Sequence, residues 1–246
     1  VIINNQAVFG AGIFNNGYAG NANPTIENCV IAYTTATSGG GGIDNFGLAG
    51  NASPIIVNSI IYGNSAAGRA GAMYCWAGNN GQTTPLSINC AYVNNSAIDG
   101  GAIVSDRKDT GPDSSGNASP AFRNCIFWGN SASGVGPQFF LLANASFVCN
   151  YSAINLTGQT SPNVITGSTT GNVYTDPLFK NILLGTGPDG NWLTADDGLQ
   201  LENGSPCIDA GDSTNVSATD IFSKSRINGA NIDMGPYESI PVVTAV

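Results

Sequence analysis

The densest cluster of oxygen-bearing side chains lies in an acidic, glycine-containing loop at residues 187–198. Ca²⁺ takes about six to eight oxygen ligands, and a turning loop can supply them from side chains and backbone carbonyls. The loop lacks the final glutamate and flanking helices of an EF-hand. The alternative is a polar turn in which aspartates cap backbone amides. The metal-site interpretation predicts a structural Ca²⁺ ion. Its ligands would be the side chains of Asp189, Asn191, Asp196 and Asp197 and the backbone carbonyl of Leu193.

More aspartates surround the last part of the chain, between residues 205 and 238. They could hold a second metal ion or form a catalytic carboxylate pair. We favour a structural role, in which they bond backbone groups and pair with Arg226 or Lys224. These residues are Asp209, Asp212, Asp220 and Asp233.

Overall composition excludes several classes of function. The chain contains no histidine, which removes the Ser-His-Asp and Cys-His nucleophile systems and most catalytic zinc sites. Its net charge of -9 argues against a nucleic-acid partner or an anionic membrane, since both require a basic face. No segment approaches the roughly 20 apolar residues of a spanning helix, so we expect no membrane span.

Aromatic and amide side chains recur at related positions in the first half of the chain, among them Tyr18, Tyr74 and Trp128. Aromatic faces bind the apolar faces of sugars, and amides bind sugar hydroxyls. The alternative is that these residues only cover the corners of the fold. A glycan groove would be formed by Phe14, Asn16, Asn45, Phe46 and Trp76.

The residues of the predicted glycan groove lie in a part of the chain that repeats about every 30 residues. Ile13, Ile43, Met73 and Ile103 follow one another at steps of 30, each after a glycine- and alanine-rich turn. Two further residue types keep nearly the same steps, namely Pro24, Pro54, Pro85 and Pro120, and Asn28, Asn58, Asn89 and Asn124.

The short alternating runs within each unit predict β-strands bounded by tight turns. Such a unit cannot bury its apolar face alone, but stacked units can pair their strands in parallel. We therefore predict an all-β, right-handed parallel β-helix, a solenoid with coils of about 30 residues and a C-terminal cap. A β-sandwich with coincidental spacing is the alternative. The coils are expected over residues 1–171, with an outward loop longest at 106–119. Closing coils and the cap, with the acidic loop, are expected over 172–246 of the same domain.

The repeat also bears on the six cysteines. Cys29, Cys90 and Cys125 occupy one position of the repeat and should stack in the core. Cys90 and Cys125 would be one coil apart, close enough in principle for a disulfide. Small thiols fill apolar columns well, so we expect most to be free.

Two motifs resemble known families. Gly100-Gly101-Ala102-Ile103, followed by Phe127-Trp128-Gly129-Asn130, resembles the GGAI and FxxN repeat of chlamydial polymorphic membrane proteins. Segments 205–212 (SPCIDAGD) and 231–238 (NIDMGPYE) are similar to the closing element of large secreted β-helix proteins of the Bacteroidetes type. The resemblance implies a bacterial secreted or cell-surface module, often adhesive, within a larger surface protein.

We therefore expect a non-catalytic module that binds glycans or another surface ligand, or acts as a rigid spacer. The alternative is a polysaccharide lyase or glycoside hydrolase. A lyase needs a basic residue near a Ca²⁺-bound uronate, and a hydrolase needs two carboxylates at a defined separation. The repeats hold few basic residues and no column of paired acids, so we assign no catalytic residue. An ice-binding face is excluded because Ile55, Leu86 and Ala121 replace Thr25 in later units.

Overall fold

The computed structural model describes residues 1–108, 115–142, 145–159 and 169–240. Within these ranges every regular element is a β-strand, and every strand pair is parallel. The strands stack as a solenoid of about five turns, which confirms the predicted parallel β-helix. Part of the predicted loop at 106–119, and residues 241–246 of the predicted cap, lie outside the described residues.

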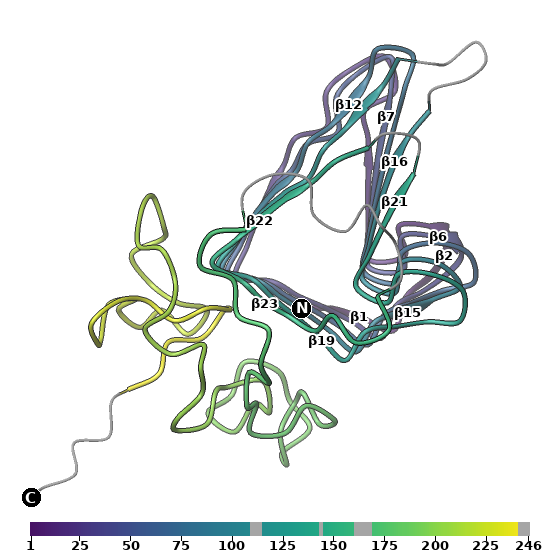
Figure 1. Cartoon of the computed structure of the whole chain (residues 1–246). Coiled ribbons are helices and arrows are strands. Elements are labelled where there is room, and N and C mark those ends of the chain that lie inside the picture. The colour runs from purple at the N-terminus through teal and green to yellow at the C-terminus, as the bar shows by residue number, and fades with distance from the viewer. Residues whose placement is uncertain (109–114, 143–144, 160–168, 241–246) are drawn as a thin grey trace, which may run out of the picture.

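Four long sheets and one short sheet run along the stack, and Figure 1 looks nearly along its axis, so that the coils overlie one another. Sheet A contains β1 (Ile2–Ile3), β5 (Val30–Ala32), β9 (Ile60–Tyr62), β14 (Ala91–Val93), β19 (Ile126–Trp128) and β23 (Ala153–Ile154). Sheet B contains β2 (Gln6–Phe9), β6 (Thr35–Gly39), β10 (Ser65–Ala66), β15 (Ser96–Ala97) and β20 (Ser131–Ala132).

The remaining sheets close each turn. Sheet C contains β3 (Ile13–Asn16), β7 (Ile43–Leu48), β11 (Met73–Gly78), β16 (Ile103–Arg107) and β21 (Phe139–Leu142). Sheet D pairs β12 (Gln82–Thr83) with β17 (Asn117–Ala118). Sheet E contains β4 (Thr25–Glu27), β8 (Ile55–Val57), β13 (Leu86–Ile88), β18 (Ala121–Arg123) and β22 (Val148–Asn150).

The interior is built from columns of equivalent residues. Ile13 pairs with Ile43, Ile43 with Met73, and Met73 with Ile103, so the apolar anchors of the repeat form one file. Sheets A, C and E contribute the rest of this core, in which the aromatic rings of later coils pack face to face or edge to face. Neighbouring coils thus form the strand hydrogen bonds and apolar contacts that a single coil cannot form alone.

Glycine and asparagine mark the corners for a conformational reason. The second glycine of the turn before sheet C, Gly40, has φ of 65°, and an added Cβ would lie 2.7 Å from the Cβ of Asp44. At the corner between sheets E and A, the repeated asparagines have φ between 46° and 53°, or 55° at Asn124. Asparagine tolerates this left-handed region better than most side chains, which explains why it recurs there.

A second set of asparagines forms a buried ladder between sheets A and B. The Asn64 amide oxygen accepts the backbone N–H of Thr34 at 2.9 Å, and its amide nitrogen donates to the Ile31 carbonyl at 2.9 Å. Asn95 and Asn130 repeat this arrangement in the next two coils. The ladder satisfies backbone groups at a corner where the strands themselves cannot pair.

The described residues from 172 to 240, here called the closing segment, form no strand and only isolated bridges. The segment packs on the outer face of sheet A, where Leu199, Ile221 and Tyr237 join an apolar cluster with the outward residues of β5, β9 and β14. In Figure 1 it lies beside the stack, in green and yellow. The corner asparagines attach it, because Asn58, Asn89 and Asn124 donate to carbonyls of Thr219, Asp233 and Asp212 at 2.8, 3.1 and 2.9 Å.

Candidate functional site

The outer face of sheet C carries a pocket of about 360 Å³ over the first three coils. Strand alternation produces it, because Ile43 and Asn45 point into the interior whereas Asp44 and Phe46 point outward. The pocket is lined by Phe9 at the end of β2, Phe14 and Asn16 of β3, Asp44 and Phe46 of β7, and Tyr74 and Trp76 of β11.

Aromatic rings make up most of this lining. The Phe46 and Trp76 rings stack, with centroids 4.8 Å apart and planes inclined by 10°. Phe14 lies 6.4 Å from Phe46 at 42°, and both Phe9 and Phe14 keep nearly half of their surface exposed. The pocket therefore offers ring faces and edges to a ligand, as sugar-binding and cation-binding sites do.

Asp44 is the one acidic residue in the lining, and it is only 2% exposed. Strand register places it between Phe14 on one neighbouring strand and Tyr74 on the other. No side chain or backbone group in the described part of the chain forms a hydrogen bond or ion pair with it. Burial among the rings raises the pKa of its carboxyl to about 8, because the charged form is poorly solvated there.

A polar network borders the pocket on the side of β16. The Tyr74 hydroxyl donates to the Asp106 carboxylate at 2.6 Å, and the Arg69 guanidinium contacts the same oxygen at 3.3 Å. Burial, and then the Asp106 charge, raise the pKa of Tyr74, so it remains a hydroxyl donor. Arg69 is thus committed to Asp106 and leaves Asp44 without a counter-ion.

Four of the five residues predicted for a glycan groove line this pocket, namely Phe14, Asn16, Phe46 and Trp76. Asn45 does not, because it is buried in the interior, where it accepts a hydrogen bond from Asn15 at 2.8 Å and donates to the Cys75 sulfur at 3.7 Å. Sequence reasoning did not assign Phe9 and Asp44 to the groove. The signal for Asp44 was its spacing of two from Phe46, which places both side chains on one face of a strand.

The acidic loop is held together by its own carboxylates. Asp189 accepts the backbone N–H of Asn191 at 2.7 Å, Asp196 accepts that of Asp189 at 3.0 Å, and Asp197 accepts that of Leu193 at 3.0 Å. In the described residues, no three His, Cys, Asp or Glu side chains come together at a metal-binding spacing. A Ca²⁺ ion there would have to draw on amide and carbonyl oxygens and compete with these capping bonds, so the calcium site stays a prediction.

The aspartates of the closing segment also bond backbone groups. Asp220 accepts from Phe222, Lys224 and Glu238, and Asp233 accepts from Asp209 and Ser239. Arg226 is buried and pairs with Glu238 at 3.6 Å, while Lys224 lies over the Phe222 ring at 5.2 Å. Burial raises the pKa of Glu238 to about 7, although the nearby Arg226 opposes this. The backbone bonds agree with the structural role that the sequence favoured. The predicted pairing with Arg226 or Lys224 is different in the structure, because Arg226 pairs with Glu238, and Asp212 pairs with Arg123 at 3.7 Å.

All six cysteines lie in the described part of the chain, and they form no disulfide there. Cys90 and Cys125 belong to the main core and Cys29 packs against it, as their shared repeat position predicts. Burial raises the pKa of Cys75 and Cys149 to about 12, which keeps these thiols protonated and unreactive.

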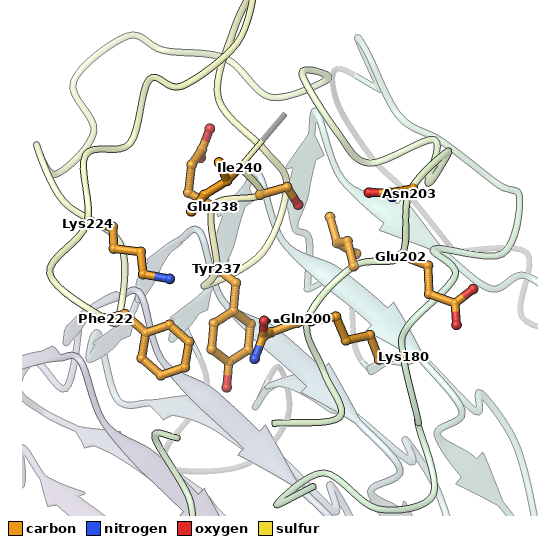
Figure 2. Close-up of a pocket in the computed structure, with 11 residues that line it drawn as sticks. Lys180, Gln200, Glu202, Asn203, Phe222, Lys224, Tyr237, Glu238 and Ile240 are labelled. Atoms are coloured by element: carbon orange, nitrogen blue, oxygen red, sulfur yellow. Dashed lines mark hydrogen bonds between the residues drawn. The ribbon is translucent and has the colours of Figure 1, made fainter. Parts of the chain in front are cut away.

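A larger, more polar pocket of about 620 Å³ lies in the closing segment (Figure 2). Three of its four charged side chains already have partners: Lys180 donates to Gln200 at 3.0 Å, Lys224 lies over Phe222, and Glu238 pairs with Arg226. The fourth, Glu202, is exposed. Figure 2 shows the Phe222 and Tyr237 rings beside each other on one side and Glu202 and Asn203 on the other. Volume alone does not make this pocket the better candidate, because it has no unpartnered buried group.

Comparison of the chain with protein-family models, curated proteins and solved structures gives no match. The described residues also contain no helix of the length and hydropathy needed to cross a membrane. The candidate function therefore rests on the pocket over sheet C.

Proposed function

We propose that this protein is a non-catalytic, secreted or cell-surface β-helix module of bacterial origin that binds glycans through the pocket over sheet C. The resemblance of the GGAI and FxxN repeats to chlamydial polymorphic membrane proteins supports this. The similarity of the closing motifs to secreted Bacteroidetes-type proteins supports it as well. A place within a larger surface protein belongs to the same proposal, and a rigid-spacer role is compatible with it.

The observation that carries the proposal is the aromatic lining combined with few polar groups. Phe14 is 46% exposed and presents a ring to the apolar face of a sugar, while the Asn16 amide lies in the same lining to bond hydroxyls. A volume of about 360 Å³ is within the range of small-ligand pockets. Strands of three successive coils fix these residues, so the site is organised before a ligand arrives.

A glycoside hydrolase is the second candidate, and Asp44 is the observation that favours it. A carboxyl with a pKa of about 8 is protonated at neutral pH and suits a general acid. Asp106, two strands away and two residues farther along the strand, would be the second carboxylate. Two strand spacings alone separate the backbones by roughly 10 Å, which is beyond the separation of about 6.5–9.5 Å in inverting enzymes. The bonds of Asp106 to Tyr74 and Arg69 also weigh against a role as base.

A glycan array with the wild-type protein tests the proposal. Phe46→Ala and Trp76→Ala should each weaken binding at least tenfold, because they remove the ring stack. Tyr174→Ala, which truncates an aromatic side chain of the closing segment that is 48% exposed, is the matched control and should bind normally.

Reducing-sugar and unsaturated-uronate assays on the bound glycans separate binder from enzyme. No turnover is expected. Turnover that Asp44→Asn or Asp106→Asn abolishes would establish the hydrolase instead, and an array without any bound glycan would contradict the binding function.

A further inference from the structure

Asp44 differs from every other buried acid in the described part of the chain. The other buried acids are Asp197, Asp220, Asp233 and Glu238, and each accepts at least one backbone N–H. Such bonds compensate for removing a carboxylate from water. Asp44 is as buried as they are but has no donor. Its burial therefore does not stabilise the fold, in contrast with that of the closing-segment acids.

Its position would suit an apolar residue better. The outward column that contains Asp44 continues with Phe14, Tyr74, Val104 and Phe140 on the other strands of sheet C. A carboxyl in such a column has a cost in stability, because an unpaired charge is poorly solvated there. Local sequence features that oppose stability without a structural gain are concentrated at functional sites.

The surroundings of Asp44 define the charge of a fitting ligand. The lining holds no basic residue, so the ionised carboxylate repels anions and lacks a counter-ion. A Ca²⁺ or Mg²⁺ ion would find only the side-chain oxygens of Asp44, Asn16 and Tyr74 in this lining, and the Tyr74 hydroxyl already donates to Asp106. These are fewer oxygens than such ions bind. Aromatic rings around a carboxylate suit an organic cation, since ring faces attract positive charge and tolerate its apolar parts.

We propose that the pocket over sheet C receives an organic ammonium group of the ligand, seated between the Asp44 carboxylate and the surrounding aromatic rings. This inference rests on the proposed function in one respect: if the protein binds glycans, the ammonium group belongs to an amino sugar. If glycans do not bind, the ammonium group would come from a methylated amine, which offers the same positive charge and apolar substituents.

Binding of a cation requires that Asp44 release its proton to solvent. The other titratable groups nearby are Tyr74 on β11, whose hydroxyl bonds Asp106, the Asp106–Arg69 pair itself, and the buried Cys75 thiol. From β2 and β3 only Phe9, Phe14 and Asn16 face the pocket. Below a pKa of about 8 the ionised fraction of Asp44 falls tenfold with each unit of pH. The affinity for a permanent cation should fall by the same factor.

The test measures binding to the full chain by calorimetry between pH 5 and pH 8. Tetramethylammonium is the first probe, because it has no proton to lose and its pH dependence reports the protein alone. A glucosamine oligosaccharide and its N-acetylated form are the second and third probes. The variants are Asp44→Asn and, as a control with the same charge change on an exposed residue of sheet E, Glu27→Gln.

We expect the affinity of the wild-type protein for tetramethylammonium to rise about tenfold for each unit by which the pH rises between 5 and 8. At pH 7 the Asp44→Asn variant should bind tetramethylammonium at least tenfold more weakly than wild type. Glu27→Gln should behave as wild type. Glucosamine binding that exceeds N-acetylglucosamine binding assigns the ammonium to an amino sugar. Tetramethylammonium binding without any glycan binding supports the cation site but ends the glycan function.

Two results would overturn the inference. In the first, neither cation binds at any pH. In the second, both oligosaccharides bind equally and Asp44→Asn leaves them unchanged, which removes the cation site while the glycan function stands. Loss of folding does not confound the variant, because replacing the buried acid by an amide is expected to stabilise the protein.

Discussion

The coils and the closing segment satisfy their backbone hydrogen-bonding groups in different ways. In the coils, strands pair with equivalent strands 27 to 36 residues away, so that the repeat itself supplies the hydrogen bonds. The closing segment has no such repeated partner. Backbone bonds of turns and isolated bridges hold part of it, and carboxylates supplement them, because Asp197, Asp220, Asp233 and Glu238 accept backbone N–H groups. Buried acids therefore differ between the two regions: those of the closing segment have backbone partners, whereas Asp44 in the coils has none, which is the basis of the cation site proposed for it.

The two regions also differ in the contacts that stabilise them. The coils share a continuous apolar core, whereas the closing segment is attached through the outer face of sheet A and the corner asparagines. We therefore expect coil mutations to lower global stability and closing-segment mutations to act locally.

The largest effect is expected in the coil core. Phe127 is fully buried among the rings of Tyr92, Phe122 and Phe139. Phe127→Ala should lower the free energy of unfolding by about 3–5 kcal/mol, because it removes apolar contacts and leaves a cavity. Urea denaturation measures this, with Leu86→Ala, which truncates a partly exposed residue on the outside of sheet E, as the control. A loss below about 1 kcal/mol would show that the stack does not share one core.

Asp44 gives the next effect, with the opposite sign. Its pKa rises from 3.8 to about 8 on folding, so its neutral form is favoured in the folded state. The corresponding stability is complete below about pH 4 and is lost as pH rises toward 8. Asp44→Asn should therefore stabilise the protein by roughly 2–4 kcal/mol at pH 7, at about 1.4 kcal/mol per pH unit, and hardly at all at pH 4. Urea denaturation at both pH values tests this, and equal stability of variant and wild type at pH 8 would contradict it.

Arg226 tests the attachment of the closing segment. Its guanidinium donates to the Asn58 amide oxygen at 2.6 Å and pairs with Glu238, so it joins the segment to the coils. Arg226→Met should destabilise the segment by roughly 2–3 kcal/mol, since it leaves buried acceptors without a donor. Hydrogen exchange should accelerate at residues 205–240 and remain slow in sheets A and C. Lys224→Met is the control, and equal acceleration in the coils would contradict independent attachment.

Calcium binding by the acidic loop would give the smallest effect. Millimolar Ca²⁺ should stabilise the protein by about 1 kcal/mol, which corresponds to a rise of a few degrees in melting temperature. Asp189→Asn should abolish the rise, whereas Glu202→Gln, which neutralises an exposed acid nearby, should keep it. No shift with calcium, and none after chelation, would remove the site and leave the loop as a capped turn.

The repeat made the coils predictable, because identical spacing forces identical positions into register. It placed Ile43 and Met73 in one file, and it gathered Phe14, Phe46 and Trp76 on one face. Strand alternation also places Asn45 in the interior, but this can be predicted only if the strand is known to begin at Ile43. The closing segment carries no period, so nothing in its sequence indicates that Leu199 and Tyr237 cover sheet A. Contacts between residues about 160 apart, such as Asn58 with Thr219, depend on tertiary packing.

Methyl–methyl nuclear Overhauser effects in selectively labelled protein test the central claim most directly, namely that the coils stack coaxially in register. Cross-peaks are expected between Ile13 and Ile43, between Ile43 and Met73, and between Met73 and Ile103, because these pairs face each other on adjacent strands. The same spectra should lack a cross-peak between Ile13 and Ile103, which lie three strands apart. Absence of the neighbouring cross-peaks, or a contact between Ile13 and Ile103, would contradict the stack and the pocket that it positions.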